Sequence, residues 1–291
     1  IATLSRAVET LDHAIQSFSA FVPVSLVRQL LESEQKLALG GHSRFLTIFF
    51  SDLEAFSTFS EEVPSQDLLM RVSDYLELVT RVIEAENGTV DKFMGDGVMA
   101  FWGAPALMDD HALRACVAAL RIQRGMDEMN ARWVAEGQKP LRIRIGIHSD
   151  AVLVGNIGSA ERMSYTVLGD GVNVAARLEG VNKEYGTRIC ISHSVYKETG
   201  ERLCVRPIEE VTVKGRRSSV PIYEVLGAFG VDAALEPAPP TVELCRMTRL
   251  AYEAFIAGDN ALARRRYEEV LAAFPNDSLA TLLLRKKMAA A

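Results

Sequence analysis

Two aspartates stand where their carboxylates could act together. Asp52 comes at the end of the apolar run 46–50, and Asp96 lies in the Gly-flanked turn that leads into the apolar run 98–102. Both runs have the length and residue types of β-strands, and the glycines favour a hairpin at that turn. If the first strand lies beside the hairpin, the two carboxylates converge and suit divalent metals that assist phosphoryl chemistry. The alternative is ordinary turn chemistry, in which Asp is common at strand ends and before Gly.

The elements that must position this pair alternate between strands and helices. The alternation of apolar and basic residues in LRIRIGI, for example, is typical of a half-buried strand. We expect strands over 44–51, 141–147, 152–157, 164–168, 189–191, 210–213 and 222–225, a hairpin over 89–101, and helices over 55–60, 65–86, 110–136 and 170–185. Interleaved helices and strands with an antiparallel hairpin predict an α+β fold around a mixed sheet.

The first residues have a heptad-like pattern. Leu4, Val8, Leu11, Ile15 and Phe18 recur at alternating spacings of four and three residues. β-Branched residues at a with Leu at d favour two parallel helices, so we expect a coiled-coil signalling helix over 1–19 and a connector helix over 20–43. The alternative is an amphipathic helix packed on its own domain.

The last residues are helical beyond a change in composition. Residues 227–240 are rich in Gly, Ala and Pro, which is typical of a linker. Helices are expected over 244–256 and 261–274, and their sequence resembles one tetratricopeptide hairpin, here assigned to 241–291. A solenoid normally needs several repeats, so this one either packs on the preceding domain or begins an array.

Composition narrows the classes of function. The chain has 291 residues, so it can hold more than one unit. Its net charge is −6 and no long Lys/Arg run stands out, so nucleic acid is not the expected main partner. Four scattered cysteines indicate neither a disulfide framework nor a zinc site, and they fit the cytoplasm. No apolar run has the length of a membrane span. Because the chain begins at Ile1, we expect a piece of a longer protein with an upstream sensor or membrane domain.

Three longer motifs identify a family resemblance. The stretches FFSDLEAFSTFSE, VDKFMGDGVMAFWGAP and YTVLGDGVNVAARLE resemble the class III nucleotidyl cyclases, over roughly residues 18–226. The resemblance implies a ferredoxin-like βαββαβ core, shared with polymerase palm domains, over 44–229. It also implies conversion of ATP to 3′,5′-cyclic AMP and pyrophosphate. Two Mg²⁺ or Mn²⁺ ions per site would be held by Asp52, Asp96 and the carbonyl oxygen of Leu53.

The same resemblance assigns residues to the triphosphate. The backbone N–H groups of Phe56 and Ser57, at the start of a helix, would hold the β- and γ-phosphates. Lys214 in VTVKGRR matches a family lysine that binds the triphosphate. Relatives commonly carry Gly and Thr where this chain has Ala55 and Ser57. Because Ala limits φ, we expect a slightly less permissive loop without loss of activity.

Asn173 and Arg177 stand four residues apart and therefore on one face of a helix. In isolation such a pair is usually a solvated face. The resemblance makes them the pair that steadies the transition state. Asn173 would hold the ribose ring oxygen, and Arg177 would neutralise the charge that grows on the α-phosphate.

Base choice is assigned to Lys92 and Thr166. Lys92 lies where adenylate-type cyclases carry Lys and guanylate-type cyclases carry Glu, and an ammonium can donate to adenine N1. The Thr166 hydroxyl can accept from the adenine 6-amino group, so ATP is favoured over GTP. Thr at this position marks the subgroup that includes bicarbonate-responsive cyclases, which implies bicarbonate as an effector.

The resemblance also implies a homodimer. Lys92 and Asp96 are four residues apart on one hairpin, yet they should meet opposite ends of ATP, which is too long for both to serve one molecule. A head-to-tail dimer with sites shared across a two-fold axis resolves this conflict. Two alternatives stay open: a catalytically weak module that binds nucleotide and signals, and a tetratricopeptide-type scaffold. The complete set of site positions argues against the first, and the single repeat argues against the second.

Overall fold

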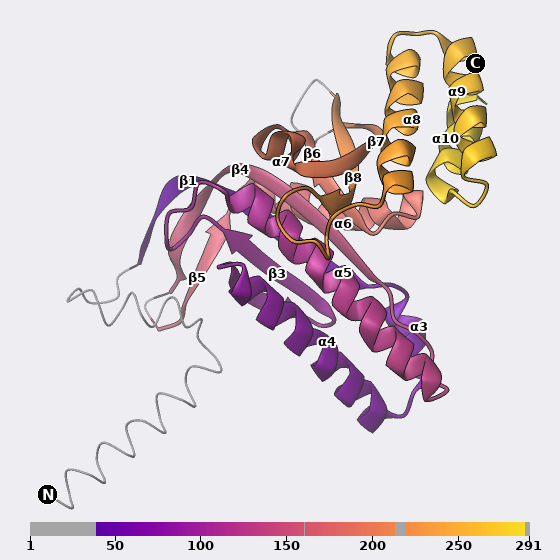
Figure 1. Cartoon of the computed structure of the whole chain (residues 1–291). Helices are drawn as coiled ribbons and strands as arrows, with labels where there is room; N and C mark the ends of the chain where they lie inside the picture. Colours follow the sequence, from indigo (N-terminus) through magenta and orange to yellow (C-terminus); the bar gives the residue numbers. More distant parts are fainter. Residues whose placement is uncertain (1–38, 160, 213–218, 289–291) are drawn as a thin grey trace, which may run out of the picture.

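A computed structural model describes residues 39–159, 161–212 and 219–288, which form a curved sheet with helices packed on both faces (Figure 1). The strands are β1 (Gly40–Leu53), β2 (Thr89–Met94), β3 (Gly97–Trp102), β4 (Ile143–Gly158), β5 (Met163–Leu168), β6 (Ile189–Ser192), β7 (Leu203–Thr212) and β8 (Ser219–Ala228). The helices are α3 (Phe56–Glu62), α4 (Ser65–Ala85), α5 (His111–Ala135), α6 (Asp170–Tyr185), α7 (His193–Thr199), α8 (Pro239–Ile256), α9 (Asn260–Ala273) and α10 (Ser278–Met288), with a 3₁₀ turn over Gly200–Arg202.

The strand order confirms the predicted α+β class. The sheet runs β2-β3-β1-β4-β6-β8-β7, and β5 pairs with β4 beside this path. The pairs β2–β3, β3–β1 and β1–β4 are all antiparallel, whereas β4 and β6 are parallel. Up to β4, the chain runs strand, helices, hairpin, helix, strand, which is the expected βαββαβ core.

Strand β1 is buried on both faces, which explains its continuous apolar sequence. Because side chains alternate along a strand, Ile48 and Phe50 enter the core under α6, while Phe49 and Leu53 enter the core under α4 and α5. Trp102 of β3 lies in the core under α4 and α5 and is fully buried. The central strand therefore has little freedom to slip, and it holds the site residues at its end.

The observed elements differ from the sequence prediction in several places. β7 begins at Leu203 and β8 extends over Ser219–Ala228, where shorter strands over 210–213 and 222–225 were expected. β4 is a single strand of 16 residues, where two strands over 141–147 and 152–157 were expected, because β1 continues opposite it throughout. Residues 40–43, expected in the connector helix, belong to β1. Helix α7 was not predicted; its cap is Ser192, whose side chain accepts from the backbone N–H of Val195.

The predicted linker over 227–240 packs against the sheet domain. The N–H of Ala228 donates to the carbonyl oxygen of Leu235 over 3.0 Å, and Arg124 donates to the carbonyl oxygen of Ala234 over 2.7 Å. The Leu235 side chain joins the core under α5. The irregular segment is shorter than the predicted linker, because β8 ends at Ala228 and α8 begins at Pro239. Burial of Leu235 holds this segment against the sheet domain.

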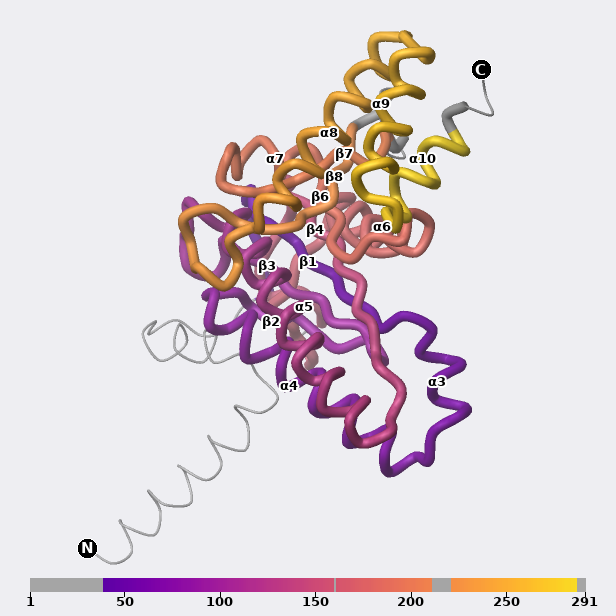
Figure 2. Tube along the Cα trace, turned by 45° about the vertical axis from the view of Figure 1, so that its right-hand side comes forward, coloured from indigo at the N-terminus to yellow at the C-terminus, as the bar shows by residue number. Residues whose placement is uncertain are grey.

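The chain ends in three packed helices where a pair was expected. α8 begins earlier than predicted, with proline in its first turn, and α10 follows α9. Leu283 of α10 and Tyr267 of α9 share a core with Leu178 of α6. Figures 1 and 2 show these helices at the end of the molecule away from α3. They pack on the sheet domain, as one of the two alternatives proposed, and their tetratricopeptide likeness stays a prediction.

Several predicted features lie outside the described residues. They are the signalling helix over 1–19, the connector helix up to residue 38, and Lys214. Among residues 39–159, 161–212 and 219–288, no helix combines the length and apolar character needed to cross a bilayer.

Candidate active site

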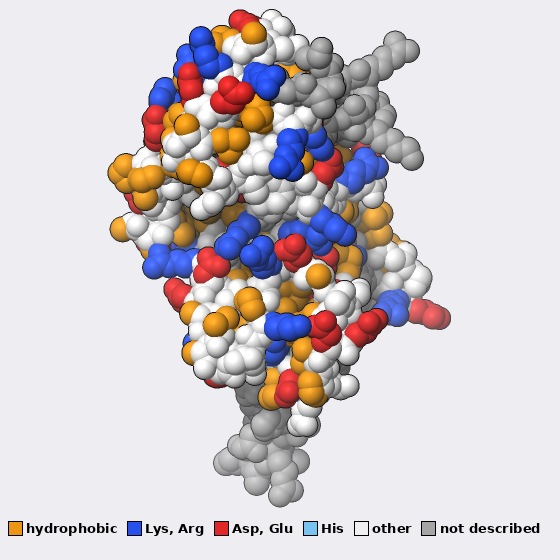
Figure 3. Space-filling model, turned by 90° about the vertical axis from the view of Figure 1, so that its right-hand side faces the viewer, with side chains coloured by type: hydrophobic (Ala, Val, Ile, Leu, Met, Phe, Trp, Pro, Cys, Tyr) orange, Lys and Arg blue, Asp and Glu red, His pale blue; other side chains and the backbone are white. Residues whose placement is uncertain are grey.

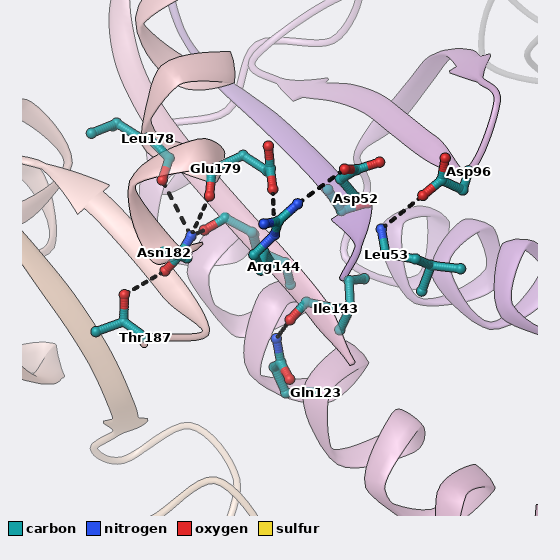
Figure 4. Close-up of polar contacts among 12 residues, drawn as sticks. Asp52, Leu53, Asp96, Gln123, Ile143, Arg144, Leu178, Glu179, Asn182 and Thr187 are labelled. Carbon is teal, nitrogen blue, oxygen red and sulfur yellow. Dashed lines mark hydrogen bonds and ion pairs between the residues drawn. The ribbon is translucent and has the colours of Figure 1, made fainter. Parts of the chain in front are cut away.

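The strand pairing brings Asp52 and Asp96 together. β1 pairs with β3 so that Ser51 lies opposite Val98, which places Asp52 beside the β2–β3 turn that carries Asp96. The Asp96 Oδ2 atom accepts the backbone N–H of Leu53 over 3.2 Å, as Figure 4 shows. The expected convergence of the two carboxylates at one edge of the sheet is therefore present.

The electrostatics of this pair suit a cation. Burial, followed by the hydrogen bond and negative charge of Asp52, raises the pKa of Asp96 to about 6. Within the described ranges no cluster of three or more His, Cys, Asp or Glu side chains could enclose a metal. Mg²⁺ sites that also bind phosphate commonly use only one or two carboxylates, with water and phosphate oxygens completing the shell. The two carboxylates fit a site of that kind, and the Leu53 carbonyl is a candidate third donor.

Arg144 connects Asp52 to helix α6. It lies opposite Asp52 in the β1–β4 register, and its Nη2 atom is 3.2 Å from Asp52 Oδ2. Its Nε atom forms an ion pair with Glu179 Oε1 at 2.9 Å (Figure 4). Burial raises the pKa of Glu179 to about 7, against the effect of the Arg144 charge. Arg144 and Glu179 were not among the predicted site residues.

Helix α6 is fastened directly to β4. The buried Asn182 side chain donates to the carbonyl oxygen of Ile145 over 2.9 Å and accepts from the Thr187 hydroxyl over 2.8 Å. Next to this anchor, Gly146 lets the helix backbone touch the strand. Asn173 and Arg177 are exposed on the outer part of the same helix, four residues apart as predicted.

Lys92 and Thr166 lie together because both contact Asp91. Lys92 Nζ is 3.4 Å from Asp91 Oδ1, and the Thr166 hydroxyl of β5 donates to Asp91 Oδ2 across 75 positions of sequence. The Lys92 side chain is half exposed, whereas that of Asp91 is 1% exposed. The structure thus groups the two predicted base-reading residues around a buried carboxylate that sequence reasoning missed.

The predicted phosphate loop has a strained residue at its start. Ala55 has φ 56° and ψ 31°, the left-handed conformation, and it caps α3, whose first residues are Phe56 and Ser57. This conformation costs a residue with a Cβ atom roughly 1 kcal/mol. The first N–H groups of a helix have no intrahelical acceptor, so those of Phe56 and Ser57 can serve an anion. Ala55 therefore adopts, with some strain, the left-handed conformation that Gly would adopt freely.

Charges of both signs mix on the surface. Figure 3 shows Lys and Arg side chains in a band across the middle of one face, with Asp and Glu among them. Together with the net charge of −6, this differs from the single-sign field typical of nucleic-acid surfaces.

Comparison with known proteins decides the family. Residues 42–227 match the adenylate and guanylate cyclase catalytic domain. The chain belongs to this cyclase family. It is 37% identical over 227 residues to adenylate cyclase 1 of Rhizobium meliloti (strain 1021). The matched region covers 78% of this chain and 34% of that protein. It is 32% identical over 233 residues to an adenylate cyclase of Anabaena cylindrica, with coverage of 77% and 45%. The chain thus spans less than half the length of either relative.

Solved structures of an adenylyl cyclase and of a guanylyl cyclase both resemble this chain. The adenylyl cyclase CyaB from P. aeruginosa has a TM-score of 0.60 and 34% identity, covering 65% of this chain and 97% of that chain. The guanylyl cyclase Cya2 has a TM-score of 0.62 and 36% identity, covering 69% and 100%. Because these structures include both types, the choice between ATP and GTP must be argued from this chain's own residues.

Proposed function

We propose that this cyclase domain is an adenylate cyclase that converts ATP to 3′,5′-cyclic AMP and pyrophosphate. The observation that carries this proposal is the convergence of Asp52 and Asp96 beside Arg144, on strands to which the α6 helix is fastened. The Lys92–Asp91–Thr166 group adds an adenine-complementary set of polar atoms. The adenylate cyclases of Rhizobium meliloti and Anabaena cylindrica support the same assignment.

The carboxylates of Asp52 and Asp96, with the Leu53 carbonyl, would hold two Mg²⁺ or Mn²⁺ ions per site. When bound, such ions supply Lewis acidity, which favours the ionised ribose 3′-hydroxyl and the departing pyrophosphate. Arg144 fixes the orientation of the Asp52 carboxylate through Oδ2. The Glu179 partner in turn restrains Arg144, so the carboxylate pair is held in place before substrate arrives.

The remaining side chains bind and orient ATP. Asn173 would hold the ribose ring oxygen so that the 3′-hydroxyl lines up with the α-phosphate. Arg177 would neutralise the negative charge that develops on that phosphate, where a preorganised guanidinium is most effective. The N–H groups of Phe56 and Ser57, with Lys214, would bind the outer phosphates.

Base recognition would favour adenine. The Lys92 ammonium is a donor that suits the N1 acceptor of adenine, whereas guanine N1 is itself a donor. Thr166 would accept from the 6-amino group. Replacing Lys92 by Glu and Thr166 by Cys should lower ATP use much further than GTP use. An unchanged ATP/GTP ratio would remove both residues from base recognition.

The first test is turnover. Purified wild-type domain with Mn²⁺ should make cyclic AMP from ATP faster than cyclic GMP from GTP. Asp52→Ala and Asp96→Ala should each lose at least about 90% of this activity while keeping the fold, because each removes a metal ligand. The matched control is Asp127→Ala, which removes an exposed carboxylate that pairs with Arg188 on the surface. A wild-type domain that binds ATP without turnover would instead support the catalytically weak module.

We also propose that each site is shared between two chains. Lys92 faces Asp91 and Thr166, while Asp96, on the same hairpin, faces Leu53. Asp52 and Asp96 would come from one chain. The partner would supply the remaining site residues, which are Lys92, Thr166, Asn173, Arg177 and Lys214. Mixing inactive Asp52→Ala with inactive Arg177→Ala protein should restore roughly a quarter of wild-type sites, since about half of the dimers are mixed. Exchange of subunits without recovery would assign each site to one chain.

The residue type at position 166 also suggests an effector. Thr166 matches the residue type of the subgroup that includes bicarbonate-responsive enzymes, so we propose that bicarbonate stimulates turnover. A dose series at fixed pH and ionic strength, with chloride as the control, tests this effector; a flat response removes it.

ATP as substrate and four free cysteines favour the cytoplasm. The coverage of less than half of the relatives fits fusion to an upstream sensor or membrane domain.

A further inference from the structure

Strand β2 contains a β-bulge at Asp91. Val90 pairs with Ala100 and Lys92 pairs with Met99, so Asp91 is an extra residue with no opposite position on β3. In a regular strand, neighbouring side chains point to opposite faces, and a bulge breaks this alternation and re-aims a side chain. The bulge therefore allows the Asp91 side chain to contact both the adjacent Lys92 and Thr166 of β5.

The buried carboxylate of Asp91 is surrounded by donors. It accepts from the Thr166 hydroxyl and from the backbone N–H of Val167, and Lys92 Nζ lies 3.4 Å from Oδ1. Burial raises the pKa of Asp91, whereas these three groups stabilise its anion. An ionised carboxylate can only accept hydrogen bonds. In the Asp91–Thr166 contact the Thr166 hydroxyl is the donor and Asp91 Oδ2 is the acceptor.

We propose that Asp91 is a positioning residue that makes Thr166 selective for adenine. A free hydroxyl can accept from the 6-amino group of adenine or donate to the 6-oxo group of guanine, so Thr166 alone does not choose. With its hydrogen committed to Asp91, Thr166 Oγ1 can only accept, which suits adenine and leaves guanine O6 without a donor. The same carboxylate restrains the Lys92 ammonium. This inference rests on the proposed function and names the group that sets its base preference.

The decisive variant is Asp91→Asn. It keeps the size of the side chain but replaces one acceptor oxygen by an NH₂ donor, so a single oxygen faces the donors of Thr166, Val167 and Lys92. The Thr166 hydroxyl is then free to turn toward the base. We expect the ATP/GTP ratio of kcat/KM to fall about tenfold, the effect of one mismatched hydrogen bond. The matched control Asp127→Asn should leave the ratio unchanged, since that carboxylate is exposed and pairs with Arg188.

A second readout separates selectivity from turnover. The dissociation constants of 3′-deoxy-ATP and 3′-deoxy-GTP, which lack the reacting hydroxyl, are measured with Mn²⁺ for the same variants. Their ratio should shift in parallel with the kinetic ratio. If wild-type protein makes no cyclic nucleotide, the proposed function is wrong, and the binding ratio still tests the role of Asp91. If wild-type protein is active but both ratios are unchanged in Asp91→Asn, the role of Asp91 is wrong.

A double-mutant cycle tests whether Asp91 acts through Thr166. Thr166→Val alone should lower the ATP/GTP ratio, and adding it to Asp91→Asn should change the ratio little further, because both remove the same interaction. Effects that multiply independently would contradict the proposal. Thr166→Ser keeps the hydroxyl and should keep the preference for ATP. If Asp91→Asn does not fold, Asp91→Ala carries the same expectation, because it also releases the Thr166 hydrogen.

Discussion

Replacing Gly146 with Ala should displace the α6 helix. An added Cβ atom would lie 2.1 Å from the backbone nitrogen of Glu179 and 2.4 Å from the carbonyl oxygen of Ala175. Because both are backbone atoms, no side chain can rotate away, and the helix must recede by about 1 Å to reach ordinary contact. Overpacking of this kind costs about 3 kcal/mol of unfolding free energy. Asn173 and Arg177 move with the helix, and a displacement of about 1 Å can lower turnover about 100-fold.

The matched control is Gly180→Ala on the same helix, where an added Cβ atom meets nothing within 4 Å. Because Ala is the better helix former, this variant should gain about 1 kcal/mol and stay active. Urea unfolding gives the stability of each variant, and cyclic AMP formation with saturating Mn²⁺ gives turnover per folded molecule. If the unfolding free energy of Gly146→Ala lies within about 0.5 kcal/mol of wild type and more than about half of the activity remains, the close contact of α6 with β4 does not hold the helix in position.

Three further predictions follow from single residues. Ala55→Gly should relieve the left-handed strain and raise stability by up to about 1 kcal/mol in urea unfolding, with activity retained; a loss of stability would contradict the strain. Glu179 has a pKa of about 7, raised by burial, so the folded state holds a proton that the unfolded state releases above its ordinary pKa of 4.5. Through Glu179, stability in a chelating buffer should therefore fall by about 3 kcal/mol between pH 4.5 and 7. Glu179→Gln should remove this part of the fall and leave the part below about pH 6 that Asp96 contributes. Arg206 is buried between Glu224 and Asp277, with Nη1 2.6 Å from Asp277 Oδ2, so Asp277→Asn should lower the thermal midpoint and cost about 2 kcal/mol; an unchanged midpoint would show that this contact does not hold the last helices.

Local features of the sequence determined most of the elements and one half of the site. The boundaries of α4, α5 and α6 follow from apolar periodicity with Gly and Pro signals, and the structure agrees within a residue or two. Asp52 and Asp96 could be paired in advance because one ends a buried strand and the other lies in a short hairpin. Asn173 and Arg177 share a helix face by spacing alone.

Only the tertiary structure decided which distant side chains meet. Arg144 contacts Asp52 across 92 positions and Thr166 contacts Asp91 across 75, and each contact depends on strand register and sheet curvature. The sequence pattern LRIRIGI shows an arginine on a strand but not the residue opposite it. The bulge at Asp91 is likewise invisible in TVDKFM, since regular alternation would send Asp91 and Lys92 to opposite faces. A shift of one residue in register exchanges the two faces of a strand, and only packing of the whole domain selects between them.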